Sequence, residues 1–242
     1  MNNKKALRRQ LSFLNAFFTL FDEKKVVCYI YLTNVRKGGF MMSTLAQLKE
    51  VALRHFAMHG YDGASLANIA AEVGIKKQSI YTYFKGKDAL FLQIYKDAYA
   101  FEMQHVVSGL EHTKNETLHD MLYTFLAQSI ERFATFDSTK FLLRNAFLPP
   151  THLHEQVLQE VYHYLDALEL LFVPIFEQKK TAGEMNAAVD TNIAATAFLA
   201  LLDGLYVEML YGDEVRLQKR FTACWTIFWQ SVRQESGGNQ YE

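Results

Sequence analysis

Residues 74–87 read GIKKQSIYTYFKGK and combine a glycine turn with a cationic, hydroxyl-rich segment. The pattern predicts a short helix that starts at Lys76 or Lys77 and runs to about Tyr83. Four lysines and no acidic residue lie between Lys76 and Lys87. Lysines, hydroxyls and an amide are the groups with which proteins hold phosphates and read base edges. This stretch therefore predicts a DNA contact surface.

Two further helices are expected just before this stretch. Apolar residues at helical spacing predict a first helix that ends near Gly60, where glycine can take a left-handed C-cap conformation. Ser65 has the hydroxyl that an N-cap needs, and it precedes a second short helix that ends at Val73. Gly74 would then join the second helix to the third, which is the arrangement of a helix-turn-helix.

The composition of the whole chain favours an all-α protein without disulfides. It has 242 residues, of which 50% are hydrophobic, and only 3 prolines and 12 glycines. Cys28 and Cys224 are far apart and form no metal or redox motif, so a reduced, cytoplasmic location is expected. The net charge is −1, and the basic residues are concentrated in the first forty positions and in residues 76–87.

Residues 1–42 form an N-terminal extension that we expect to be disordered or to precede the true start of translation. Lys37-Gly38-Gly39 is what a purine-rich ribosome-binding site encodes when it is read in frame, and Met41 and Met42 follow it. The alternative is a basic arm that contacts DNA. N-terminal sequencing of the native protein distinguishes the two. Residues 238–242 are expected to be a disordered tail.

The segment 43–90 as a whole resembles the DNA-binding domain of the TetR family of bacterial regulators. The positions that carry the resemblance are Ala52, Phe56, Gly60, Tyr61, Ser65, Leu66, Ile69, Ala70, Val73, Gly74, Ile75, Ile80, Tyr81, Tyr83, Phe84, Lys87 and Leu90. The resemblance implies two groups of DNA-binding residues beside the cationic Lys76. Phosphate contacts would come from Ser65, Ser79, Tyr81, Tyr83 and Lys87, and base contacts from Lys77, Gln78 and Thr82.

Gln78 departs from the pattern of the family, because many relatives have proline, glycine or alanine at this position. A long amide there can read adenine, so the operator sequence cannot be transferred from relatives.

The segment 91–237 is expected to be a larger, all-helical effector-binding and dimerisation domain. The pattern predicts helices over 88–110, 115–136, 137–148, 153–180, 190–211 and 214–234, with Asn115 as an N-cap, Asp137 as a cap and a kink at Pro174. The helix at 190–211 is nearly all apolar, but Asp203 and Glu208 interrupt it, which argues against a membrane span. Such a helix is usually buried on two sides. The last two helices, about 190–237, are therefore expected to form a homodimer, as the resemblance also implies.

Many aromatic residues lie on the middle helices, where they either form the core or line an effector cavity. The resemblance implies a cavity for a small, largely hydrophobic effector, with His105, Phe125 and Phe147 as candidate ligand-binding residues. In the alternative, the aromatic residues are core and His105 is a partly buried structural histidine. The histidines cross the predicted helix boundaries without a ligand motif, so we expect no metal and no cofactor.

These features predict a repressor that binds a palindromic, double-stranded DNA operator as a dimer. Effector binding would shift the long helix that starts at Asp88 and change the separation of the two DNA-binding heads. The alternative is a TetR-like regulator that a protein partner controls. No nucleophile–base pair, phosphate loop or paired carboxylate motif is recognisable, so we expect no enzyme activity.

Overall fold

The computed structural model describes residues 43–234, which confirm the expected all-α class. Within this range the chain forms helices joined by turns, and the only β-type pairing is an isolated bridge between Met185 and Arg233. The hypotheses about residues 1–42 and about the tail at 238–242 lie outside the described residues. The chain divides into two compact units, one ending at Glu102 and the other beginning at Met103. The predicted domain boundaries stay predictions.

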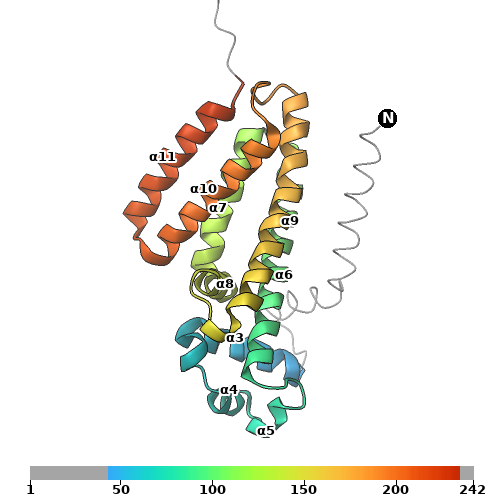
Figure 1. The fold of residues 1–242 in the computed structure, drawn as a ribbon, viewed down its shortest axis with the longest axis vertical. Helices are drawn as coiled ribbons and strands as arrows, with labels where there is room; N and C mark the ends of the chain where they lie inside the picture. The colour runs from blue at the N-terminus through green and yellow to red at the C-terminus, as the bar shows by residue number, and fades with distance from the viewer. Residues whose placement is uncertain (1–42, 235–242) are drawn as a thin grey trace, which may run out of the picture. The chain divides into compact units, whose positions relative to one another are not determined.

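In its described part, residues 43–102, the N-terminal unit is helical (Figure 1). Its helices are α3 (Thr44–Gly63), α4 (Leu66–Val73), α5 (Lys77–Ile80) and the first part of α6 (Lys87–Thr113). Gly60 interrupts α3 with φ 70° and ψ −178°, close to where the sequence predicted the helix to end, but α3 continues to Gly63 and its C-cap is Ala64. The core of this unit is made of residues with little or no exposure, among them Leu48, Phe56, Ile69, Ile80, Leu90 and Phe91.

The second unit contains the remaining helices. They are α7 (Leu118–Thr135), α8 (Asp137–Phe147), the short 3-10 helix η1 (Thr151–Leu153), α9 (His154–Thr181), α10 (Thr191–Tyr211) and α11 (Glu214–Val232). Helix α10 packs mainly against α9 and α11, which flank it in Figure 1. Pro174 lies inside α9.

Two of the predicted caps are wrong. The N-cap of α7 is Thr117 and not Asn115, because the Thr117 hydroxyl accepts the Asp120 N–H at 3.1 Å. Asp137 is the first residue of α8 and does not cap it, since Phe136 holds the cap position without a side-chain hydrogen bond. The helix start predicted at Asp190 is confirmed within one residue, because the Asp190 carboxylate caps α10 by accepting the first free N–H groups.

Phe198 of α10 lies at the centre of the apolar core of the second unit. Its ring is 5.1 Å from that of Phe172, 5.7 Å from that of Phe125 and 5.6 Å from that of Phe228. These neighbours come from α9, α7 and α11, so one side chain joins the four helices. Burial of these rings removes apolar surface from water, and the tilted and edge-on ring contacts add a further favourable interaction.

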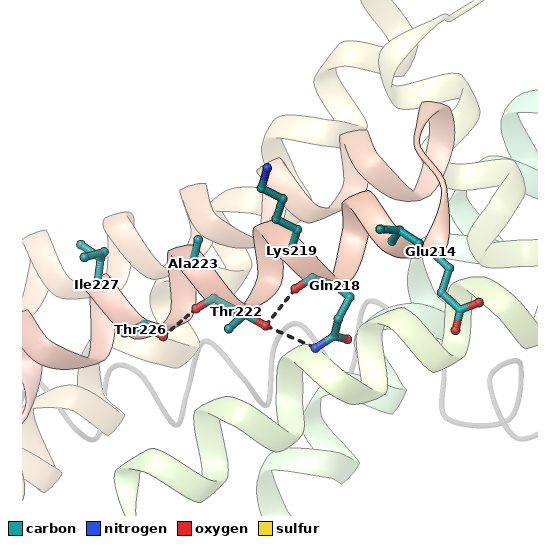
Figure 2. Close-up of a pocket in the computed structure, with 8 residues that line it drawn as sticks. Glu214, Gln218, Lys219, Thr222, Ala223, Thr226 and Ile227 are labelled. Atoms are coloured by element: carbon teal, nitrogen blue, oxygen red, sulfur yellow. Dashed lines mark hydrogen bonds between the residues drawn. The ribbon is translucent and has the colours of Figure 1, made fainter.

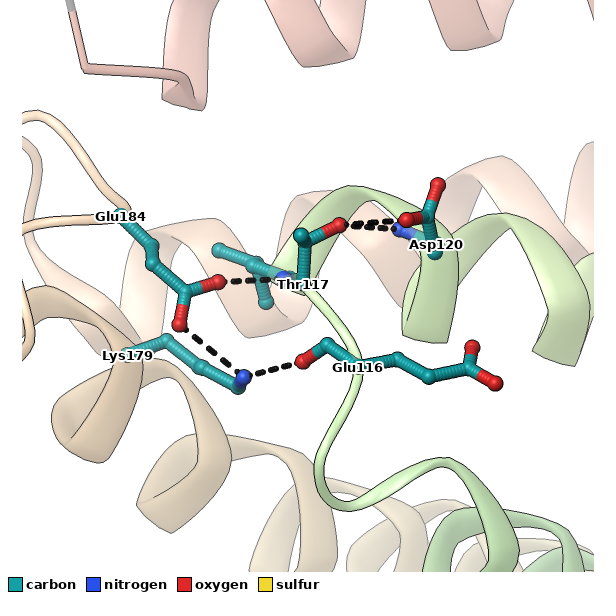
Figure 3. A network of polar contacts seen from close by, with 6 residues as sticks. Glu116, Thr117, Asp120, Lys179 and Glu184 are labelled. Carbon is teal, nitrogen blue, oxygen red and sulfur yellow. Dashed lines mark hydrogen bonds and ion pairs between the residues drawn. The ribbon is translucent and has the colours of Figure 1, made fainter.

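A polar cluster connects the start of α7 to the end of α9 (Figure 3). Lys179 is 7% exposed, and its ammonium donates to the Glu116 carbonyl oxygen and lies 3.0 Å from the Glu184 carboxylate. The second carboxylate oxygen of Glu184 accepts the Leu118 N–H at 2.6 Å. This N–H belongs to the first turn of α7, where no carbonyl of the helix can accept it. The cluster therefore gives the buried Lys179 ammonium its partners and also provides an acceptor for a free N–H at the start of α7.

Helix α10 is long and apolar enough to span a membrane when judged by length and composition alone. In the structure, nine of its residues are buried, including Phe198 and Glu208. Its buried side packs on helices of the same unit, as expected for a core helix.

Candidate nucleic-acid interface

A tight turn at Gly74 joins α4 to α5. Gly74 has φ 79° and ψ 26°, and its N–H donates to the Ala71 carbonyl oxygen at 3.1 Å. The next N–H, that of Ile75, donates to the Ala70 carbonyl oxygen at 2.9 Å. A Cβ on Gly74 would meet nothing within 4 Å, so the left-handed backbone and not a lack of space favours glycine here. The turn confirms the predicted junction between the two helices.

Helix α5 is anchored by one fully buried residue and exposes most of the others. Ile80 has no exposed surface, whereas Tyr81 is 52% and Tyr83 is 44% exposed. The exposed residues of this segment are Lys76, Lys77, Gln78, Tyr81, Thr82, Tyr83 and Lys85, and Ser79 is half-buried. The helix ends at Ile80, earlier than predicted, because the chain continues as turns in which Tyr83 and Phe84 both donate to the Ile80 carbonyl oxygen.

Two of the predicted contact hydroxyls already make local hydrogen bonds. Ser65 caps α4 by accepting the Ala67 N–H at 3.2 Å, as predicted, which leaves its hydroxyl hydrogen for an external acceptor such as a phosphate oxygen. The Thr82 hydroxyl donates to the Ser79 carbonyl oxygen at 2.7 Å. Thr82 therefore presents oxygen lone pairs and a methyl group, which suit base edges better than phosphates.

Lys87 does not extend freely from the first turn of α6. Its ammonium lies 4.3 Å from the centroid of the Tyr61 ring and 3.4 Å from the Asp62 carbonyl oxygen. The Tyr61 hydroxyl in turn donates to the carboxylate of Asp88. In the sequence, Tyr61 is one of the positions that carry the family resemblance, and no role was predicted for it. The sequence feature that could have predicted this arrangement is the aromatic residue Tyr61 directly after Gly60.

A charged cluster that sequence reasoning missed joins α3 to α4. Glu72 accepts from His55 at 2.7 Å and also pairs with Arg54. The hydrogen bond from His55 and the charge of Arg54 hold the pKa of Glu72 below its ordinary value. Arg54 and His55 lie on α3 and Glu72 lies on α4, so the cluster stabilises the relative placement of these two helices.

The three candidate effector residues lie in different surroundings within the second unit. Phe125 is 4% exposed, and its ring meets that of Phe172 edge-on at 4.8 Å. Phe147 of α8 is 41% exposed, and the His105 ring is 5.5 Å from that of Phe136. Close by in the sequence, Gln104 has a buried side-chain oxygen to which no described residue donates.

An open groove of about 860 Å³ runs along α11 (Figure 2). All the residues that line it belong to this helix, and they include Val215, Thr222, Ala223, Thr226 and Ile227. The Thr222 and Thr226 hydroxyls donate to carbonyl oxygens of the preceding turn, so their methyl groups are left to face outward. None of the three candidate effector residues lines this groove.

The sequence of the helix-turn-helix matches that of a known family of bacterial regulatory proteins. Residues 48–94 match the family of bacterial regulatory proteins named tetR, and this range holds α4, α5, the Gly74 turn and Lys87. The chain belongs to the TetR family. It is thus a DNA-binding transcriptional regulator, as the resemblance in sequence implied.

Two relatives show how far this similarity extends. The chain is 27% identical over 173 residues to the HTH-type transcriptional repressor AcnR of Corynebacterium diphtheriae, which covers 69% of the chain and 82% of that repressor. It is 33% identical over 79 residues to IcaR of Staphylococcus aureus, the negative transcriptional regulator of the biofilm operon icaADBC. That second match covers 33% of the chain and only 41% of IcaR.

Solved structures share the fold over most of the chain. A TetR transcriptional regulator from Chloroflexus aurantiacus superposes with a TM-score of 0.67 at 20% identity, covering 80% of this chain and all of that one. Escherichia coli NemR in its reduced form superposes with a TM-score of 0.63 at 14% identity, covering 81% of this chain and 100% of that one. At these identities the TetR fold is what the superpositions share.

Proposed function

We propose that this TetR-family regulator is a cytoplasmic repressor that binds a palindromic DNA operator as a homodimer. The observation that carries the proposal is the exposed surface of α5 and the following turns, where lysines, Gln78 and hydroxyls surround the fully buried Ile80. A buried anchor below an exposed, cationic helix is what a recognition helix needs in order to keep its orientation in a groove. Both relatives, AcnR and IcaR, are named as negative regulators.

The residues of this surface divide into phosphate and base contacts. Ser65, Ser79, Tyr81, Tyr83 and Lys87 contact phosphates, since they offer hydroxyl hydrogens or a cation. Lys76 adds positive charge at the start of α5. Lys77, Gln78 and Thr82 face the bases, where an amide and a cation can discriminate adenine and guanine.

The homodimer forms through the outer faces of α10 and α11. Large apolar side chains are exposed there, at Ile193 (68%), Tyr211 (63%), Val215 (78%) and Ile227 (65%). An exposed apolar face of this kind is characteristic of an association site. A second copy packed on α11 would cover the open groove of Figure 2 and bury these side chains. Two recognition helices about 34–36 Å apart then fit successive major grooves of a palindrome.

A small, largely hydrophobic effector releases the repressor from its operator. His105, Phe125 and Phe147 are the candidate contacts, and the unpaired oxygen of Gln104 offers an acceptor to a ligand with a donor group. Helix α6 is continuous from Lys87 to Thr113, so it carries both a DNA-contact residue and His105. A ligand that binds one position of α6 better than the other shifts the population away from DNA. The alternative is control by a protein partner.

The experiment that tests the repressor is a gel shift with DNA from the upstream and neighbouring regions of its own gene. A specific shift is expected, and competition by random DNA should not remove it. Adding hydrophobic compounds tests release. If no flanking fragment shifts while the protein is folded, the operator-binding repressor is contradicted.

A further inference from the structure

Tyr61 is fixed on three sides in the DNA-binding unit. Its ring stacks on Phe56 with an interplanar angle of 4° and meets Phe91 edge-on at 5.3 Å. Its hydroxyl donates to Asp88 in the first turn of α6. Burial, together with the hydrogen bond to Asp88 and the charge of that residue, raises the pKa of Tyr61, so the phenol stays a neutral donor. The ring is therefore a rigid platform.

The ammonium group of Lys87 lies over this ring, 4.3 Å from the ring centroid. The second contact of the ammonium is the Asp62 carbonyl oxygen at 3.4 Å. A ring face and a carbonyl attract the cation but do not neutralise it, in contrast to a carboxylate. The flexible side chain of Lys87 is thus held in one place by contacts that are not carboxylates.

We propose that Tyr61 is a positioning residue for DNA binding, whose ring holds Lys87 ready for a phosphate. This inference rests on the proposed function, in which Lys87 contacts the DNA backbone. A lysine loses rotamer freedom when it is fixed on a phosphate, and this loss lowers the affinity. Because the Tyr61 platform has already restricted Lys87 in the free protein, less freedom remains to be lost on binding.

A purely structural role for Tyr61 makes a different prediction, since Phe56 and Phe91 also belong to the core of the unit. In that case, removing the ring would weaken DNA binding by the same factor whether or not Lys87 is present. A positioning role requires that the effect of Tyr61 vanish when Lys87 is absent. Lys85 is the matched control, because it is an exposed lysine two positions earlier and no contact with Tyr61 involves it.

The test measures affinity of the full chain for a random-sequence DNA duplex across a salt series, since a phosphate contact does not depend on sequence. We expect Lys87→Ala to lower affinity by about tenfold and to reduce the salt slope by about one. Tyr61→Leu should lower affinity severalfold alone, have no further effect in the Lys87→Ala background, and multiply with Lys85→Ala. Tyr61→Phe keeps the ring face but loses the hydrogen bond to Asp88, so it should lower affinity less than Tyr61→Leu does.

A second measurement covers the case in which Tyr61→Leu does not fold. The ε-methylene protons of Lys87 should show an upfield ring-current shift by NMR in the wild type and in Tyr61→Phe. Absence of that shift overturns the inference, as does an undiminished effect of Tyr61→Leu in the Lys87→Ala background. An unchanged affinity of Lys87→Ala overturns only this inference if the wild type binds DNA. If the folded wild type binds no DNA even at low salt, the proposed function fails as well.

Discussion

Glu208 of α10 and Arg220 of α11 form an ion pair with 2.7 Å between the carboxylate oxygen and Nε. The carboxylate is 5% exposed, whereas the guanidinium is 55% exposed. The other carboxylate oxygen lies 3.2 Å from Nε of Arg216, also on α11. Two arginines on the solvent side thus pair with one buried carboxylate. This arrangement joins the two helices that we propose as the dimer interface.

The two arginines should be able to replace each other. Arg220→Ala is expected to cost only about 0.5 kcal/mol of unfolding free energy, because Arg216 remains and an exposed partner contributes little. The double variant Arg216→Ala/Arg220→Ala should cost roughly 2–3 kcal/mol, since it leaves a buried carboxylate without compensation. Urea unfolding measures both. If the double variant loses no more than the sum of the single variants, the shared role of the arginines is wrong.

Local signals in the sequence predicted most of the helix ends correctly. The turns at Gly60 and Gly74 have a positive φ, and Ser65 caps a helix because its hydroxyl oxygen accepts the N–H two residues later. The end of α5, predicted near Tyr83, and the start of α7, predicted at Asn115, differ from the structure. At the start of α7, the Leu118 N–H is accepted by Glu184, which is 66 residues away in the sequence. A contact of this range leaves no pattern in the residues around the helix start, whereas the Thr117 cap is local and could have been recognised.

The candidate DNA-binding site was predictable as a surface but not as a set of contacts. The lysines of residues 76–87 could be recognised by their charge alone. That Lys87 lies on the Tyr61 ring depends on how α3 and α6 pack, which periodicity does not specify. Aromatic composition likewise cannot distinguish a core ring from a ligand contact. Phe125, predicted as a ligand contact, packs on other rings.

Gln78 and Lys87 should affect DNA binding in different ways. Gln78→Ala is expected to change the preference at one base pair by about 1–3 kcal/mol and to leave the salt slope unchanged, because an amide reads a base edge. Lys87→Ala should weaken binding to operator and random DNA by similar factors. Selection of preferred sequences followed by salt titration measures both effects. Equal losses on operator and random DNA for both variants would contradict base reading by Gln78.

A charge on α11 should separate the dimer if the outer face of this helix is the interface. Ala223 lines the open groove, so Ala223→Glu would place a carboxylate where the partner must pack. We expect the dissociation constant of the dimer to rise at least tenfold, with weaker operator binding as a consequence. Sedimentation velocity measures the oligomeric state. Tyr162→Glu on α9, at a position that is 56% exposed, is the matched control and should remain dimeric. A dimeric Ala223→Glu variant would exclude this face.

Asp203 should make the protein less stable at neutral pH than at acidic pH. Burial raises the pKa of this carboxyl in α10 above its ordinary value of 3.8, so folding favours the protonated form. The contribution of Asp203 to the free energy of unfolding is therefore fully present below pH 3.8. It is lost as the pH rises through the pKa that the group has in the folded state. Asp203→Asn should unfold at a higher urea concentration than the wild type at pH 7, and the advantage should shrink as the pH falls toward 4. Asp166→Asn, at an exposed position on α9, controls for the loss of one charge. An advantage of Asp203→Asn that is equal at both pH values would mean that the amide acts through packing rather than through titration of the acid.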